Sequence, residues 1–216
     1  MIRNVALIAG RELRSYLRTP MGYIIAAVLL AVDGLLFNAF AMGTAERFSA
    51  DVIKDFFYFS AGTTMVLAIL ISMRLFAEER QMGTMVFLRT APLTDGEAVA
   101  GKYLAALSYV ILVTLLTLPM PLLIMVNGKI ALGHLVAGYL GLFLLGSASV
   151  AIGTLGSVLA NNQVVAAITS TAMLMVLLLS WLLARVTEPP LGDIFSHLSL
   201  FDKHFTPFMR GMIHTQ

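Results

Sequence analysis

A long uncharged stretch places this chain in a membrane. Residues 130–184 contain no Asp, Glu, Lys or Arg, and His134 is their only side chain that titrates near neutral pH. A helix that crosses a bilayer needs about 20 mostly apolar residues, so this stretch is too long for one crossing. Asn161, Asn162 and Gln163 form the natural turn, because polar residues between two apolar runs mark a loop. We therefore predict two membrane-spanning helices here.

The composition of the whole chain agrees with this prediction. Hydrophobic residues make up 59% of the 216 residues and charged residues 12%, whereas soluble domains carry about 25% charged residues. The net charge of +2 is too small to indicate a nucleic-acid partner. Because the chain has no cysteine, disulfides and thiolate metal sites are excluded.

Three further apolar runs lie upstream, so the predicted fold is all-α: a polytopic transmembrane helical bundle of five spans. The spans are expected at about 21–42, 56–76, 103–126, 133–157 and 164–184. Residues 1–184 form the predicted membrane domain. Residues 185–216 form the predicted extracytoplasmic tail, in which the apolar side chains of residues 193–210 indicate an interfacial helix.

The first residues predict an elbow helix that lies on the membrane surface. Over residues 2–19 the basic side chains fall on one side of a helix and the apolar ones mainly on the other. The basic residues are Arg3, Arg11, Arg14 and Arg18. Pro20 ends this helix, because proline lacks an N–H and restricts the residue before it. A cleaved signal peptide is not expected, since the apolar run from Pro20 exceeds a usual signal core and further spans follow.

The distribution of Lys and Arg predicts the orientation in the membrane. The N-terminal segment carries four basic residues, and residues 74–102 carry four more. The loop after the first span has Arg47 and Lys54 among three acidic residues, and the loop after the third has only Lys129. Since cytoplasmic loops are enriched in Lys and Arg, the N-terminus and residues 77–102 are expected on the cytoplasmic side.

Residues 77–102 form the only densely charged stretch between the predicted spans. Their order and spacing resemble the cytoplasmic region of type-2 ABC export permeases, in which an acidic pair and a basic residue precede Gly-Thr, a Thr/Ser-Ala/Ser-Pro step and a Gly-Lys pair. The residues that carry the resemblance are Glu78, Glu79, Arg80, Gly83, Thr84, Thr90, Ala91, Pro92, Gly101 and Lys102. Residues 11–13, 19–23 and 162–168 most resemble the gliding-motility-type branch.

The resemblance implies a non-catalytic permease subunit of an ATP-driven exporter in a bacterial cytoplasmic membrane. A separate ABC ATPase subunit would hold ATP and Mg, with no cofactor in this chain. Two membrane subunits, a homodimer or a pair of homologues, would form the pathway across the lipid bilayer. A cytoplasmic coupling helix, expected over Glu78–Thr84, would receive the push of the ATPase. The expected interface residues, whose charges would pair with the partner, are Glu78, Glu79, Arg80, Gly83, Thr84, Arg89 and Pro92.

Two departures from the family pattern are visible. Family members usually have a sixth span after the external helix, and the sequence ends where that span is expected to begin. This leaves open a truncated sequence or an absent crossing. Arg89 stands where the family usually has an apolar residue. The alternative interpretation of residues 77–102 is an ordinary solvated loop that obeys the positive-inside rule.

Residues 96–103 match most of a phosphate-binding loop without completing it. Such a loop needs Ser or Thr after its lysine to hold magnesium, and a preceding strand to aim its amides. Tyr103 follows Lys102 here, at the start of an apolar span. ATP binding by this chain is therefore not expected.

Asp33 lies in the middle of the first span, where a charge costs about 3 kcal/mol. A protonated, paired or cavity-facing carboxyl is therefore expected. Two interpretations remain open. Asp33 either lines a substrate pathway or bonds to a neighbouring helix, with Asn38 nearby on its own helix.

The fourth span carries small residues at helical spacing, which allow close approach of helix backbones. They are Gly146, Ser149, Gly153 and Ser157. Packing within one subunit is the favoured use, and a subunit interface is the alternative. In the third span, Pro119 and Pro121 are expected to distort the helix.

Other function classes fit less well. A buried serine nucleophile at Ser147 or Ser149 would need a histidine in a later span, and a metalloprotease at Glu78 and Glu79 would need histidine ligands. The sequence places neither. The remaining alternative to a permease is an ATP-independent membrane carrier or a scaffold subunit of a larger envelope complex.

Overall fold

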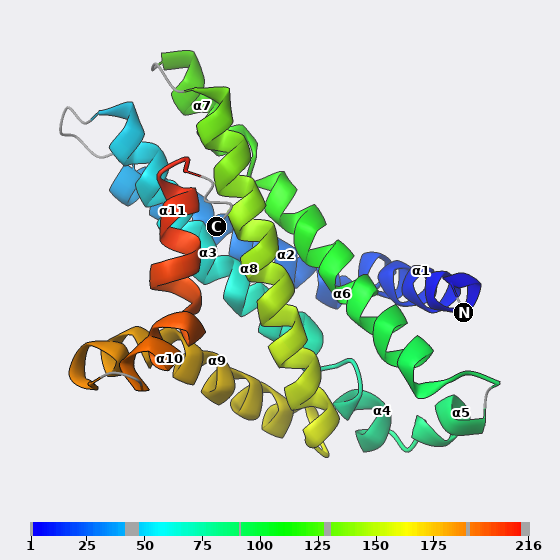
Figure 1. Cartoon of the computed structure of the whole chain (residues 1–216). Helices are drawn as coiled ribbons and strands as arrows, with labels where there is room; N and C mark the ends of the chain where they lie inside the picture. The colour runs from blue at the N-terminus through cyan, green and yellow to red at the C-terminus, as the bar shows by residue number, and fades with distance from the viewer. Residues whose placement is uncertain (1, 42–47, 91, 128–130, 189–190, 213–216) are drawn as a thin grey trace.

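The computed structural model describes residues 2–41, 48–90, 92–127, 131–188 and 191–212, and every regular element in these ranges is helical (Figure 1). Five helical segments are long and apolar enough to cross a membrane: Pro20–Ala39, Ser49–Gln81, Asp95–Val126, Leu132–Leu159 and Gln163–Val186. The number of candidate spans in the described residues agrees with the five predicted.

The first half of the chain contains α1 (Ile2–Arg18), α2 (Pro20–Leu36), η1 (Phe37–Ala41), α3 (Ser49–Ser72), α4 (Ala77–Gln81), α5 (Met85–Thr90) and α6 (Asp95–Leu116). The second half contains α7 (Pro119–Asn127), α8 (Leu132–Leu159), α9 (Gln163–Val186), α10 (Leu191–Leu198), η2 (Leu200–Phe205) and α11 (Thr206–Met209). Helix α3 is central, because it packs against α2, α6 and α8, while α1 lies against α6. Helices η1 and η2 are π-helical.

Two spans begin several residues earlier than hydropathy predicts. Helix α3 starts at Ser49 and α6 at Asp95. At α6 the reason is a capping box. The Thr94 hydroxyl accepts a hydrogen bond from the Glu97 N–H at 3.3 Å, and the Glu97 carboxylate accepts one from the Thr94 N–H at 3.1 Å. Local hydrogen bonds thus extend the helix through polar residues.

The third span is interrupted near its end. Helix α6 ends at Leu116 and α7 begins at Pro119. Between them the Thr117 N–H donates to the Thr114 carbonyl oxygen at 3.2 Å, a bond to the residue three positions back that tightens the turn. Pro119 has no N–H with which to continue the helical pattern. The distortion predicted for Pro119 and Pro121 lies at this turn.

Small residues bring α3 and α8 into close contact. Gly138 faces the ring of Phe57, and Gly153 faces Ser72, and neither position leaves room for a Cβ atom. Ser72 is itself held in place, since its hydroxyl donates to the Ala68 carbonyl oxygen at 2.6 Å. Such contacts replace the hydrophobic effect as the source of helix association in a membrane.

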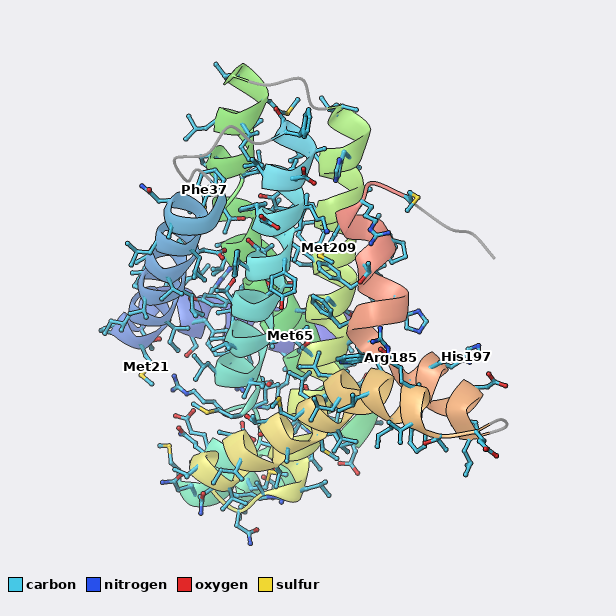
Figure 2. All side chains as sticks on the ribbon, turned by 90° about the vertical axis from the view of Figure 1, so that its left-hand side faces the viewer. Met21, Phe37, Met65, Arg185, His197 and Met209 are labelled. Carbon is cyan, nitrogen blue, oxygen red and sulfur yellow. The ribbon has the colours of Figure 1, made fainter. Side chains whose placement is uncertain are left out.

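The tail differs from the single helix predicted over residues 193–210. Helix α10 ends at Leu198, and η2 begins only after Ser199. Phe205 and Met209 are buried in the core cluster that includes residues of α3 and α8. Figure 2 shows Met209 on the bundle side and His197 at the outer edge. The large apolar side chains therefore fold this part of the tail back along the bundle, and the interfacial position of α10 stays a prediction.

Candidate functional site

The charged segment between the second and third spans forms two short helices at one end of the bundle (Figure 1). They meet at Gly83, whose φ is 71°. The Gly83 N–H donates to the Arg80 carbonyl oxygen at 3.2 Å, and the Thr84 N–H donates to the Glu79 carbonyl oxygen at 2.9 Å. This is a Schellman motif, which uses the left-handed conformation that glycine tolerates. The helix expected over Glu78–Thr84 is shorter than predicted: α4 ends at Gln81, the turn at Gly83 follows, and α5 begins only at Met85.

Both acidic residues of α4 are paired within the chain. The Arg74 guanidinium donates to the two Glu78 carboxylate oxygens at 2.8 and 3.1 Å, a bidentate contact. The Lys102 ammonium lies 2.8 Å from Glu79 Oε1 and 3.2 Å from Glu12 Oε1, and its side chain is only 3% exposed. We expected these carboxylates to pair with a partner protein. In the structure they join α4 to α1, to α6 and to the end of α3.

A polar cavity of about 210 Å³ lies beside these ion pairs. Its charged lining residues are Glu12, Arg74, Glu78, Glu79 and Lys102. Within the described residues, Glu79 Oε2 is buried without a hydrogen-bond partner. Burial raises the pKa of the Tyr16 hydroxyl, which also lines the cavity, and the Glu12 carboxylate adds to this effect. The Tyr16 hydroxyl therefore stays protonated near neutral pH.

Helix α4 is also tied to the end of α8 and to the turn that follows α8. The Ser157 hydroxyl oxygen accepts hydrogen bonds from the N–H groups of Phe76 and Ala77 at 3.0 and 3.1 Å. These are N–H groups that the first turn of a helix leaves without a partner. At the other end of α4, the Arg80 guanidinium donates to the Ala160 carbonyl oxygen at 3.1 Å. Ser157 was selected from the sequence only as a small residue; its hydroxyl caps α4.

The exposed side of the segment is apolar. Met82, Val86 and Phe87 are 67%, 62% and 75% exposed. Pro92 is exposed as well, whereas the side chain of Arg89 lies outside the described residues. Sequence reasoning selected the charged residues here and missed these three side chains. The available signal was an apolar run inside a loop that the charges marked as cytoplasmic.

Asp33 is buried inside the bundle, with 4% exposure. Its carboxyl group faces α3, where Ser60 Oγ lies 3.2 Å from Oδ2 and Thr63 Oγ1 lies 3.1 Å from Oδ1. Asn38 is exposed on η1 rather than buried beside Asp33. The structure therefore joins Asp33 to a neighbouring helix, and a role in a substrate pathway stays a prediction.

The small-residue face of α8 packs inside the chain. Gly146 faces side chains of α3 and α6, and Gly153 faces α3. Ser149 is fully buried and donates to the Leu145 carbonyl oxygen at 2.8 Å. Gly156, close to this face, contacts Ser170 of α9. Packing within one subunit accounts for these glycines.

An apolar groove of about 600 Å³ opens between α2, α3, α9 and η2. Its lining includes Leu29, Val32, Met65, Met175, Trp181 and Phe201. The Arg185 guanidinium lies 4.6 Å from the centre of the Trp181 ring, near the end of α9 (Figure 2). Both views show α9 leaving α8 at a steep angle, so the groove lies between α9 and the rest of the bundle.

The chain was compared with known protein families and with curated proteins. A family model described as an ABC-2 type transporter matches residues 3–181. No curated protein matches the chain. The matched residues include α1, all of α2 to α8, the charged segment and most of α9.

Proposed function

The chain belongs to the ABC-2 type transporter family, and we propose that it is the permease subunit of an exporter that a separate ATPase subunit drives through the α4–α5 segment. Membrane permease domains of this family are typically non-catalytic. In this proposal ATP and Mg bind to the ATPase. The N-terminus and residues 77–102 face the cytoplasm of a bacterial cell, as the positions of Lys and Arg indicate. Membership of the gliding-motility-type branch is part of the proposal and rests on the sequence resemblance.

One observation carries the coupling role: the α4–α5 segment is anchored on its inner side and apolar on its outer side. The anchors reach three parts of the bundle, through Lys102 on α6, Glu12 on α1 and Ser157 on α8. A push on such a segment moves the helices to which it is bonded, because buried ion pairs and hydrogen bonds hold it in one position. An ordinary solvated loop has no need of these anchors.

The candidate interface residues divide into two roles under this proposal. Glu79 and Arg80 transmit force, since their partners lie in distant parts of the chain, whereas Glu78 pairs locally with Arg74 and steadies the turn before α4. Gly83, Thr84, Arg89 and Pro92 shape or extend the surface that meets the ATPase. The contact itself is made chiefly by Met82, Val86 and Phe87, because desolvated apolar side chains supply most of the binding energy of a protein interface.

The groove between α2, α3 and α9 is the proposed cargo-facing surface. Its lining is mostly apolar, which suits an amphipathic substrate in contact with lipid. One bundle of this size would line only half of a pathway, so a second membrane subunit, either a copy or a homologue, is expected to complete it.

Co-purification tests the coupling surface. We expect the full chain to purify with its ATPase subunit and the variant Phe87→Ser to lose that subunit, since an exposed aromatic anchor contributes about 2 kcal/mol or more to an interface. The matched control is Phe48→Ser, because Phe48 is 82% exposed at the start of α3, at the other end of that helix from α4.

Two results would contradict the proposal. Equal recovery of the ATPase with Phe87→Ser and with Phe48→Ser would remove the apolar surface from the interface. A stable wild-type chain that retains no ATPase subunit would favour an ATP-independent carrier or an envelope scaffold instead.

A further inference from the structure

A hydroxyl-lined carboxyl group sits in the middle of the bundle, away from the α4–α5 segment. Asp33 of α2 is 4% exposed, and its two oxygens lie against Ser60 and Thr63 of α3. A cavity of about 10 Å³ adjoins it and is also lined by Thr114 of α6 and by Thr117, which follows α6. This volume holds about one water molecule. The carboxyl group is therefore almost completely removed from bulk solvent.

The hydrogen-bond contacts of Thr63 indicate where a proton lies. Thr63 has one hydroxyl proton and two acceptors in reach, the Asp33 Oδ1 atom and the Ser60 carbonyl oxygen, both at 3.1 Å. Threonine within a helix commonly donates to a carbonyl of the preceding turn. When Thr63 donates in this way, its lone pairs are free to accept from Asp33. A proton on Oδ1 then satisfies both contacts at once, while Ser60 donates to Oδ2.

The charges around Asp33 favour the same state. Within the described residues no Lys, Arg or His forms an ion pair with it. Its hydrogen-bond partners on α3 are the uncharged hydroxyls of Ser60 and Thr63. The polar groups that line the adjoining cavity are also uncharged hydroxyls, those of Thr64, Thr114 and Thr117. From α8 the titratable neighbour is Tyr139, whose hydroxyl bonds to Thr117 at 3.0 Å. An ionised carboxylate with only hydroxyl partners is costly in a membrane interior.

We propose that Asp33 is an intramembrane proton-binding site, protonated on Oδ1 and donating to Thr63 Oγ1 in the closed bundle. The site lies beside Thr117, where α6 is interrupted before Pro119. Movement at this turn that admits water would stabilise the ionised carboxylate and release the proton. Proton binding is therefore linked to the conformation of the bundle. The dry arrangement described here, which we call closed, holds the proton tightly, and an arrangement that admits water to Asp33 does not. This inference does not depend on the identity of the ATPase or of the cargo.

Infrared difference spectroscopy of the full chain in lipid vesicles at pH 7 tests the site. We expect Asp33→Asn to remove a carbonyl band of a protonated carboxyl group. The matched control Asp51→Asn changes an exposed carboxyl group of α3 and is expected to leave that carbonyl band unchanged. Loss of a carboxylate band in Asp33→Asn would overturn the proposal.

Two further spectra keep the proposal testable even where Asp33→Asn does not fold. The wild type alone must show the protonated-carboxyl band at pH 7, because ordinary Asp and Glu side chains, with pKa values of about 4, are ionised there; its absence overturns the proposal. Thr63→Val removes the acceptor and keeps the side-chain shape. It is expected to shift the band, and an unchanged band would overturn the assignment of the proton to Oδ1.

Discussion

Lys102→Met is expected to detach the α4–α5 segment from the bundle and to reduce permease-dependent ATP hydrolysis by the complex more than tenfold. The Lys102 side chain is 3% exposed and lies between the carboxylates of Glu12 and Glu79. Removing one member of a buried ion pair costs about 3–5 kcal/mol. We expect the lower end of that range, because Glu12 and Glu79 remain 18% and 20% exposed. Limited proteolysis of the segment and ATP hydrolysis by the co-purified complex measure the two effects.

Arg74→Met is the matched control for this prediction. Its ion pair with Glu78 is 20% and 29% exposed and links the turn before α4 only to α4 itself, so its loss is expected to cost about 1 kcal/mol or less. Adding Glu12→Gln and Glu79→Gln to Lys102→Met should restore resistance to proteolysis without restoring coupling, because the repelling charges are gone but the links are also absent. Wild-type proteolysis and hydrolysis in Lys102→Met would show that this cluster plays no part in coupling.

Gly153→Ala is expected to force α3 and α8 apart and to destabilise the bundle by about 1–3 kcal/mol, the usual effect of overpacking. A Cβ atom at this position would overlap Ser72 Oγ and lie 2.7 Å from Ser72 Cβ. The Ser72 side chain is fixed by its bond to the Ala68 carbonyl oxygen, so it does not rotate away freely. Thermal unfolding of the purified chain in detergent measures the loss.

A compensating change separates steric overlap from other causes. Ser72→Gly removes the atoms that the new methyl group meets, so the double variant is expected to be more stable than the sum of the two single changes allows. Gly62→Ala is the control, because a Cβ atom there meets nothing within 4 Å. Equal melting temperatures for Gly153→Ala and Gly62→Ala would refute the close α3–α8 contact.

The spans were predictable because membrane insertion depends on consecutive residues. A run of about 20 apolar side chains is a local property, and the turn expected at Asn161–Gln163 separates α8 from α9 as predicted. The early start of α6 was also readable, since Thr94 and Glu97 have the spacing of a capping box, but a hydropathy window gives no weight to such polar contacts.

The sequence predicted which segment forms the candidate site, but it did not predict which residues that segment contacts. Charge density marked residues 77–102, yet charge alone does not tell whether a carboxylate faces solvent, a partner or its own chain. Glu79 meets Lys102 of α6, which the sequence placed in the family resemblance and in an incomplete phosphate-binding loop but did not pair with Glu79. The exposed Met82, Val86 and Phe87 were missed for the same reason, because exposure is a property of the folded bundle.

From sequence alone, the number of spans, their approximate bounds and a family resemblance followed, because each depends on the kind and order of neighbouring residues. The fold had to supply the pairs: Lys102 with Glu12, 90 positions away, Ser157 with Phe76, 81 positions away, and Asp33 with Ser60, 27 positions away. Each of these pairs requires a donor atom and an acceptor atom from different parts of the chain to lie about 3 Å apart. Those distances are set by how glycine and serine faces pack, which spacing along the chain does not specify.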